Sequence, residues 1–124
     1  MRIIIADDQR HARSGLRALL SASLPAPMIW EAGTGVEAER LAGEVDPDVI
    51  LMDVRMPEMG GVDATRRIKS RFPGIRIIMI SLDASSGAAA MAAGADGFVA
   101  KSEDPARLLE TLSALDIPPR TGCA

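Results

Sequence analysis

Short apolar runs alternate along the chain with longer segments whose apolar residues recur every three or four positions. The short runs predict five strands, at residues 3–6, 28–30, 49–52, 77–80 and 97–99. The central runs are rich in branched side chains and apolar at consecutive positions, which is typical of parallel strands covered on both faces. The runs therefore predict a buried parallel sheet.

Four of the longer segments each carry one apolar stripe, as helices packed on a sheet do. The stripes are Ala12, Leu16, Leu19 and Leu20; Ala38, Leu41, Ala42 and Val45; Thr65, Ile68 and Phe72; and Leu108, Leu109, Leu112 and Leu115. Asp46-Pro47 and Phe72-Pro73-Gly74 predict helix ends, and Asp104-Pro105 predicts a helix start. Repeated strand and helix pairs with right-handed crossovers predict an α/β fold, a five-stranded doubly wound parallel sheet with helices on both faces.

Polar residues follow the predicted strands at the edge where an open parallel sheet binds its ligands. Asp7 and Asp8 follow the first strand, Asp53 comes at the end of the third, Ser81 follows the fourth and Lys101 follows the fifth. Converging carboxylates repel one another unless a cation lies among them, and an all-oxygen site favours Mg²⁺ over Zn²⁺. With a lysine and a hydroxyl nearby, such a site suits a phosphoryl group.

Each of these residues also has an ordinary interpretation. Asp8 can cap a helix that begins near Arg10, Ser81 can be a turn residue, and Lys101 can be a solvated surface charge. The combination at successive strand ends, and no single residue, favours a functional site.

Composition narrows the class of protein further. The 124 residues carry a net charge of −3 and are 48% hydrophobic, which fits one compact domain. A mixed, slightly acidic surface gives no electrostatic argument for binding nucleic acid or a membrane. We recognise no signal peptide and no apolar run of about 20 residues, and the single cysteine excludes an internal disulfide, so we expect a cytoplasmic protein.

Several stretches together resemble the receiver domains of bacterial two-component response regulators. They are IIIADD, EAGTGVEA, DPDVILMDVRMPEMGG, IIMIS and GADGFVAKS, which together span nearly the whole chain. The resemblance implies a flavodoxin-like sheet of strand order 2-1-3-4-5 in a receiver domain at residues 1–116. The prolines after Ile117 indicate a C-terminal tail at residues 117–124, which we expect to be flexible. Arg13-Ser14-Gly15-Leu16 and Lys101-Ser102 further resemble receivers linked to helix-turn-helix output domains.

The resemblance also assigns roles around the metal. Asp53 would accept a phosphoryl group from a histidine kinase or phosphotransfer protein, in a reaction that needs Mg²⁺ or Mn²⁺. Asp7, Asp8, Asp53 and the backbone carbonyl of Arg55 would hold the metal. Lys101 would pair with Asp53 and then with the phosphoryl oxygens. The implied protein is a signalling domain and not an enzyme, with no nucleic-acid binding of its own.

Phosphorylation is expected to change the face formed by the fourth helix, the fifth strand and the fifth helix. Ser81 would donate its hydroxyl to the phosphoryl group, and Phe98, at the position of the family's switch aromatic, would turn toward the core. An ordinary core phenylalanine is the alternative. The face would contact an output domain or a partner protein, and a homodimer through the fourth or fifth helix is compatible with the sequence.

Three features depart from the family's pattern or modify it. Ser102 stands where many receivers have proline after the lysine, which leaves the preceding bond open to either the cis or the trans form. Residues 81–94 form a short segment with Met91 as the one large apolar anchor, so we expect a short, weakly docked and mobile fourth helix. Leu82, with Arg55 and Asp83, is expected to cover Asp53 partly and to slow hydrolysis of its acyl phosphate.

Other functions share part of this pattern. A Mg²⁺-dependent phosphohydrolase with an aspartyl nucleophile typically needs an acid two residues past the nucleophile, where this chain has Arg55. A flavin-binding protein needs a hydroxyl-rich phosphate loop after the first strand, where this chain has acids. A pseudo-receiver that acts only as an interaction surface is a third possibility, against which the intact acidic site argues.

Overall fold

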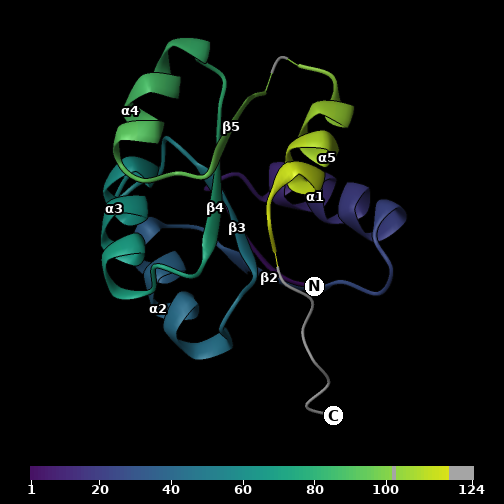
Figure 1. Cartoon of the computed structure of the whole chain (residues 1–124), viewed down its shortest axis with the longest axis horizontal. Coiled ribbons are helices and arrows are strands. Elements are labelled where there is room, and N and C mark those ends of the chain that lie inside the picture. Colours follow the sequence, from purple (N-terminus) through teal and green to yellow (C-terminus); the bar gives the residue numbers. More distant parts are fainter. Residues whose placement is uncertain (102, 118–124) are drawn as a thin grey trace.

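The protein forms a five-stranded parallel sheet in a computed structural model that describes residues 1–101 and 103–117 (Figure 1). The strands are β1 (Arg2–Ala6), β2 (Met28–Ala32), β3 (Val49–Asp53), β4 (Arg76–Ser81) and β5 (Gly97–Ala100). They lie in the order β2-β1-β3-β4-β5, and all neighbouring strands run parallel. The predicted sheet and its strand order are confirmed.

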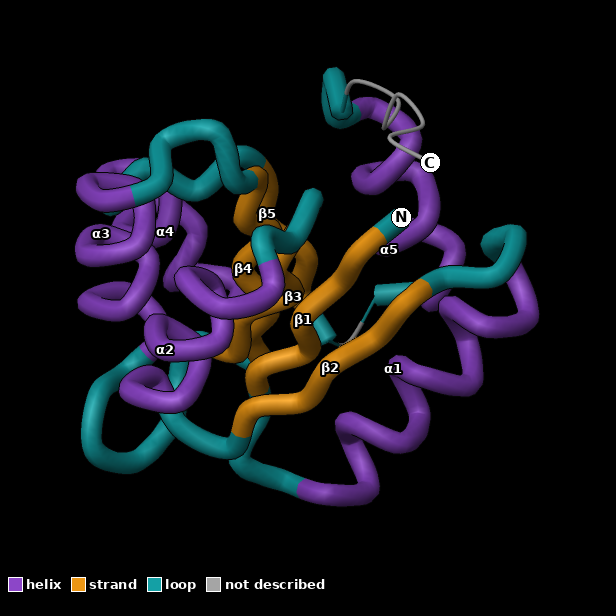
Figure 2. Tube along the Cα trace, turned by 90° about the horizontal axis from the view of Figure 1, so that it is seen from below, coloured by secondary structure: helices purple, strands orange, loops and turns teal. Residues whose placement is uncertain are grey.

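Helices connect successive strands and cover both faces of the sheet (Figure 2). They are α1 (Arg10–Ser23), α2 (Gly35–Val45), α3 (Gly61–Arg71), the 3₁₀ turn η1 (Ala84–Ser86), α4 (Gly87–Ala92) and α5 (Pro105–Ala114). Helices α1 and α5 lie on one face, and α2, α3 and α4 lie on the other. Within residues 1–101 and 103–117, no helix is long and apolar enough to cross a membrane.

Alternating residues of the inner strands supply two separate apolar layers. Ile4 and Ile50 pack with residues of α2, α3 and α4, whereas their neighbours Ile3 and Leu51 pack with residues of α1 and α5. All four side chains are almost completely shielded from solvent. Because successive side chains of a strand point to opposite faces, burial on both faces explains the uninterrupted apolar runs.

The helix boundaries follow local signals in the chain. Asp104 Oδ1 accepts the N–H of Ala106 at 2.9 Å and caps α5, as predicted. Asp46, at φ 49°, ends α2 in the left-handed conformation. The alternative role of Asp8 as a helix cap is not realised, because Gln9 occupies the N-cap position of α1 and no side chain caps that helix.

The fourth helix is short, but the prediction that Met91 anchors it is wrong. The six-residue α4 turns the Met91 side chain outward, where it is 51% exposed. The helix instead docks through the methyl group of Ala90, which is completely buried, followed by the nearly buried Ala93 and Ala95. Alanine methyl groups remove little apolar surface from water, so this docking contributes little free energy.

Two predictions concern residues at the edge of the described chain. Ile117, the first residue of the predicted tail, packs against the apolar layer between the sheet, α1 and α5. Residues 118–124 and Ser102 lie outside the described residues, and with them the rest of the predicted tail and the geometry of the bond after Lys101.

Candidate functional site

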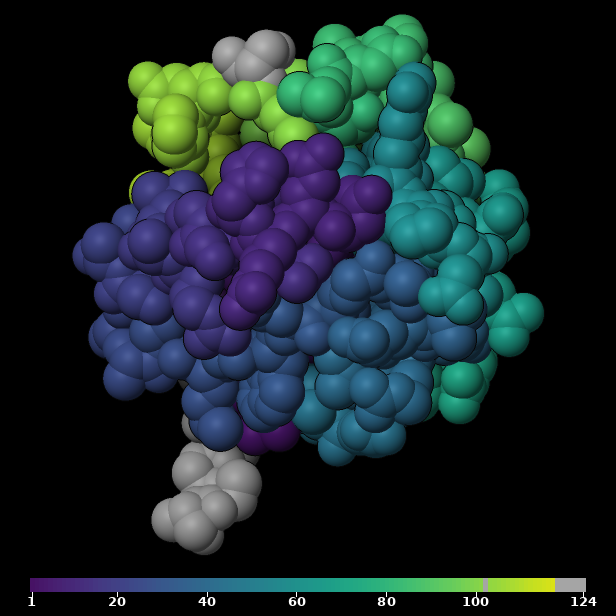
Figure 3. Space-filling view, turned by 180° about the vertical axis from the view of Figure 1, so that it is seen from behind, coloured from purple at the N-terminus to yellow at the C-terminus, as the bar shows by residue number. Residues whose placement is uncertain are grey.

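Polar side chains gather at the carboxyl ends of four neighbouring strands. Asp7 follows β1, Asp53 and Ser81 are the last residues of β3 and β4, and Lys101 follows β5. Because these strands are parallel, their ends meet at one edge of the sheet. Figure 3 shows this edge, where the purple segment after β1 lies beside the green segments that follow β4 and β5.

Three carboxylates converge at this edge. Asp7, Asp8 and Asp53 each offer an oxygen, and the three oxygens lie within 4.8 Å of one another. Asp7 and Asp53 are buried, whereas Asp8 is exposed at the rim. Hard divalent cations such as Mg²⁺ bind all-oxygen sites with retained water, and an exposed rim leaves room for that water. The donor set therefore fits Mg²⁺.

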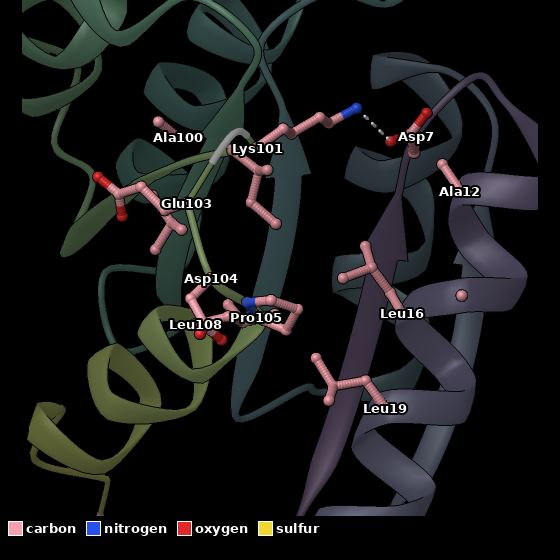
Figure 4. A pocket seen from close by; sticks show the side chains of 13 residues that line it. Asp7, Ala12, Leu16, Leu19, Ala100, Lys101, Glu103, Asp104, Pro105 and Leu108 are labelled. Carbon is pink, nitrogen blue, oxygen red and sulfur yellow. Dashed lines mark hydrogen bonds and ion pairs between the residues drawn. The ribbon is translucent and has the colours of Figure 1, made fainter.

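Lys101 bridges the two buried carboxylates. Its Nζ lies 2.9 Å from Asp7 Oδ2 and 3.5 Å from Asp53 Oδ2, and Figure 4 shows the side chain reaching across to Asp7. Burial acts to lower the pKa of Lys101, but the hydrogen bond with Asp7 and the charges of both carboxylates outweigh it and raise that pKa. The lysine therefore stays charged, and its shorter contact is with Asp7.

Asp53 is the carboxylate whose environment is least favourable to its charge. Burial raises its pKa, and the negative charge of Asp7 adds to the effect. Lys101 and the N–H of Arg55, 3.4 Å from Oδ1, act in the opposite direction without cancelling it. A desolvated carboxylate of this kind gains strongly from a cation or an electrophile at its oxygen.

Asp7 is held by contacts from four directions. Its N–H donates to the Ala32 carbonyl at 3.0 Å, and its Oδ1 accepts the N–H of Gln9 at 2.9 Å. Its Oδ2 accepts from Lys101, and its carbonyl oxygen accepts from Arg13 Nη1 at 2.7 Å. The sequence did not predict the contact with Arg13, which entered there only as part of a stretch that resembles one group of receivers. The position of Arg13 a few residues after the two acids was the signal that could have indicated it.

Ser81 lies buried at the end of β4. Its Oγ accepts the N–H of Asp83 at 3.0 Å. A serine hydroxyl accepts and donates at the same time, so this bond fixes the oxygen and leaves the proton for another acceptor. The Asp83 carboxylate turns away to accept from the backbone and hydroxyl of Ser85 at the start of η1.

A cavity of about 490 Å³ opens over Asp53. Arg55, Leu82 and Asp83 line it together with residues that follow β1, including Asp8. Leu82 is 78% exposed, so its side chain stands at the rim of this cavity. The cavity leaves a route from solvent to the Asp53 oxygens.

Phe98 lies half-buried on β5, beneath the start of α4. A Cβ placed on Gly87 would come within 3.4 Å of Phe98 Cδ2, so the ring and the helix are in close contact. The ring packs against the apolar layer that includes Ala90. The Phe98 ring thus forms part of the surface on which the start of α4 packs.

A second cavity, of about 350 Å³, borders the site behind Lys101. Leu16 and Leu19 of α1 face Pro105 and Leu108 of α5 across it (Figure 4). The candidate site thus has a polar opening above Asp53 and an apolar hollow on its α1 side.

Comparison with known proteins identifies the family. The family described as "Response regulator receiver domain" matches residues 3–113, so this chain belongs to it. The nitrate/nitrite response regulator protein NarP of Escherichia coli (strain K12) is 39% identical over 114 residues, 90% of this chain and 53% of that protein. The chain thus spans about half the length of the curated relatives it matches.

Solved structures agree with this assignment. A two-component response regulator of the LuxR family from Aurantimonas sp. SI85-9A1 is 36% identical, with a TM-score of 0.85 over 91% of this chain and 82% of that one. The response regulator domain of Thermotoga maritima CheB is 27% identical, with a TM-score of 0.81 over 96% of this chain and 98% of that one. The predicted receiver family and its phosphoacceptor signalling role are confirmed. The predicted resemblance to receivers linked to helix-turn-helix output domains agrees with the LuxR family to which the first of these structures belongs.

Proposed function

We propose that Asp53 of this receiver domain accepts a phosphoryl group from a phosphohistidine on a histidine kinase or phosphotransfer protein, in a Mg²⁺-dependent reaction. The observation that carries the proposal is the convergence of Asp7, Asp8 and Asp53 within 4.8 Å, with the Lys101 ammonium beside them. The cavity above Asp53 gives a donor access to its oxygens.

In the proposed transfer, an Asp53 oxygen forms a bond to phosphorus while the bond between phosphorus and the imidazole nitrogen breaks. The nitrogen keeps the electron pair, and the product is an acyl phosphate on Asp53. Lys101, already 3.5 Å from Asp53 Oδ2, would donate to a phosphoryl oxygen, and Ser81 would donate its free proton to another.

The metal would be held by Asp7, Asp8, Asp53 and the carbonyl oxygen of Arg55. Bound there, Mg²⁺ would neutralise charge on the phosphoryl oxygens and on the converging carboxylates. Asp7 lies deepest and is held by its own hydrogen bonds, whereas Asp8 stands at the exposed rim. Water would reach the metal from the Asp8 side.

We infer that phosphorylation acts on the face formed by α4, β5 and α5. Movement of Ser81 toward the phosphoryl group would free space for Phe98, whose ring supports Gly87 at the start of α4. An output domain or partner protein would read the change, or a second copy of the domain would. The relatives, about twice as long as this chain, support an output domain elsewhere in the protein. We infer that the protein acts in the cytoplasm.

Intact mass after incubation with acetyl phosphate and Mg²⁺ tests the proposal. We expect a gain of one phosphoryl group, about 80 Da, which disappears in Asp53→Asn and in the presence of EDTA. A chain that binds Mg²⁺ but never gains the mass, even in a rapidly quenched time course, would contradict the proposal and favour a phosphorylation-independent interaction module. Release of phosphate from an added small phosphate ester, with turnover, would instead indicate the phosphohydrolase.

A further inference from the structure

Arg13 links the first helix both to the acidic loop after β1 and to the half-buried carboxylate of Glu31. Its Nε donates to Glu31 Oε1 at 2.9 Å, and its Nη1 donates to the carbonyl oxygen of Asp7 at 2.7 Å. The Arg13 and Glu31 side chains are 18% and 29% exposed. One planar guanidinium therefore connects α1, β2 and the peptide between the two acids that follow β1.

The peptide that Arg13 holds is the one that orients Asp8. A peptide unit is planar, so fixing the carbonyl of Asp7 also fixes the N–H of Asp8 and the direction of its Cα. The Asp7 carboxylate has partners of its own in Gln9 and Lys101. Among the described residues, by contrast, no hydrogen bond or ion pair holds the Asp8 carboxylate, so its direction follows from the backbone and from its own side-chain rotamer.

We propose that Arg13, held in place by Glu31, is a positioning residue that directs the Asp8 carboxylate toward the metal. The proposal rests on the proposed Mg²⁺-dependent function and extends it beyond the acids themselves. Arg13 touches neither the metal nor the phosphoryl group; it acts through the peptide between Asp7 and Asp8. Groups that orient metal ligands in this way typically change metal affinity by about 10- to 100-fold.

Glu31 is suited to hold the guanidinium still. Its second oxygen accepts from Arg17 Nε at 2.8 Å. The hydrogen bond from Arg17 lowers the pKa of Glu31 and, with the bond from Arg13, outweighs the opposing effect of burial. Glu31 therefore remains ionised near neutral pH, and a charged, two-sided acceptor restrains both arginines.

Arg17 provides a matched control within the same cluster. It bonds the same carboxylate and also the carbonyl of Ile29 at 3.3 Å, so it ties α1 to β2 much as Arg13 does. Its partners do not include Asp7. If Arg13 merely attached the helix to the sheet, loss of either arginine would have the same effect on the metal site.

The experiment compares Mg²⁺ affinity, by isothermal titration calorimetry, in the full chain and in four variants. We expect Arg13→Ala to weaken binding about 10-fold and Arg17→Ala to change it by less than about twofold. Arg13→Lys should restore little, because one ammonium does not reproduce the planar fork that reaches both acceptors. Glu31→Gln, which keeps the shape of the side chain, should weaken binding by an intermediate factor.

Hydrogen exchange of residues 7–10 in metal-free protein gives a second readout that needs no bound metal. We expect faster exchange there in Arg13→Ala than in Arg17→Ala. Equal Mg²⁺ affinity in folded Arg13→Ala and wild type, or equal losses in both alanine variants, would overturn the positioning role. If Arg13→Ala does not fold, unchanged affinity in Glu31→Gln and full rescue in Arg13→Lys would overturn it. Absence of Mg²⁺ binding in the wild type would overturn the proposed function itself.

Discussion

Helix α1 contributes residues to the cavity over Asp53, helix α4 follows the segment after Ser81, and each helix buries one side chain completely. In α1 that side chain is Leu20, and Arg13 and Arg17 add ionic contacts to β2. In α4 it is Ala90, on a helix of six residues for which no side-chain hydrogen bond or ion pair is found in the described part of the chain. Helix α1 is thus firmly attached to the sheet, whereas α4 is attached mainly through one buried methyl group.

The two helices have different roles in this account, because α1 positions metal ligands and α4 moves in response to the phosphoryl group. The firmly attached helix carries the residue that orients the acidic loop, where sub-ångström placement of ligands matters. The weakly attached helix lies over Phe98, where the proposed response requires movement. Segments with few buried apolar contacts open locally at small free-energy cost, so α4 is the element that a phosphoryl group can shift most easily.

The largest expected effect comes from removing the apolar anchor of α1. Leu20→Ala should lower the free energy of unfolding by about 3 kcal/mol, because a completely buried leucine leaves a cavity. Met91→Ala on α4 should change it by less than about 0.5 kcal/mol, because that side chain is half exposed. Urea denaturation measures both. Comparable losses would show that α4 is anchored as firmly as α1.

Substitution of the glycines at the two ends of α4 should strengthen or weaken the attachment of this helix. Gly87→Ala should stabilise the chain by about 0.5–1 kcal/mol, since φ is −57° there and the nearest atoms facing the new methyl group belong to the Phe98 ring, the closest at 3.4 Å. Gly94→Ala should destabilise it by about 1 kcal/mol, because φ is +103°. Thermal unfolding of both variants shows whether each substitution raises or lowers stability. Destabilisation by Gly87→Ala would mean that the ring cannot accommodate the methyl group.

Acid should weaken the ionic attachment of α1. The pKa of Glu31 is lowered in the folded state, so its contribution to stability is complete above about pH 4.5, its ordinary pKa, and is lost as the pH falls through the lower folded value. At pH 7, Glu31→Gln should cost about 0.5–1 kcal/mol, and the difference from wild type should shrink below pH 4.5.

Glu44→Gln serves as the control for this pH dependence, because the Glu44 ion pair with Arg40 is exposed on α2. Unfolding in urea at pH 7 and pH 3.5 measures both variants. A wild-type advantage over Glu31→Gln that persists undiminished at pH 3.5 would contradict the ionic attachment.

The smallest expected effect concerns Leu82 at the rim of the cavity. Leu82→Ala should speed loss of the phosphoryl group about twofold, or roughly 0.4 kcal/mol in the barrier, because an exposed side chain screens Asp53 only partly. The rate is followed by intact mass after removal of acetyl phosphate. An unchanged rate would show that water reaches the acyl phosphate without passing Leu82.

Much of the fold could be predicted from the sequence because the signals for strands and helix ends lie in short stretches of the chain. Runs such as residues 49–52 are apolar at every position, which is typical of a strand buried on both faces, and Asp104-Pro105 is a strong helix start. Strand β2 extends past the predicted residue 30, because the charged Glu31 is paired by two arginines from α1. The pattern of apolar residues ends at such a charged residue and therefore predicts the end of the strand there.

The candidate site could be predicted in part for the same reason. Asp7, Asp53 and Lys101 lie at or directly after the ends of parallel strands, so the sheet brings them together irrespective of loop conformation. The direction of a side chain on a short helix and a bond from a side chain to a distant carbonyl depend on three-dimensional packing. For this reason the outward turn of Met91 and the contact of Arg13 with Asp7 were not predicted.

The contrast between helices α1 and α4 is tested most directly by hydrogen exchange measured by mass spectrometry. The exchange is measured before and after treatment with acetyl phosphate and Mg²⁺. We predict that residues 87–93 exchange much faster than residues 14–23 in the untreated chain. After phosphorylation, residues 82–98 should change while residues 14–23 do not, and Asp53→Asn should show no change in either segment. Equal protection of the two helices before treatment, or an unchanged pattern despite a confirmed phosphoryl group on Asp53, would contradict the account.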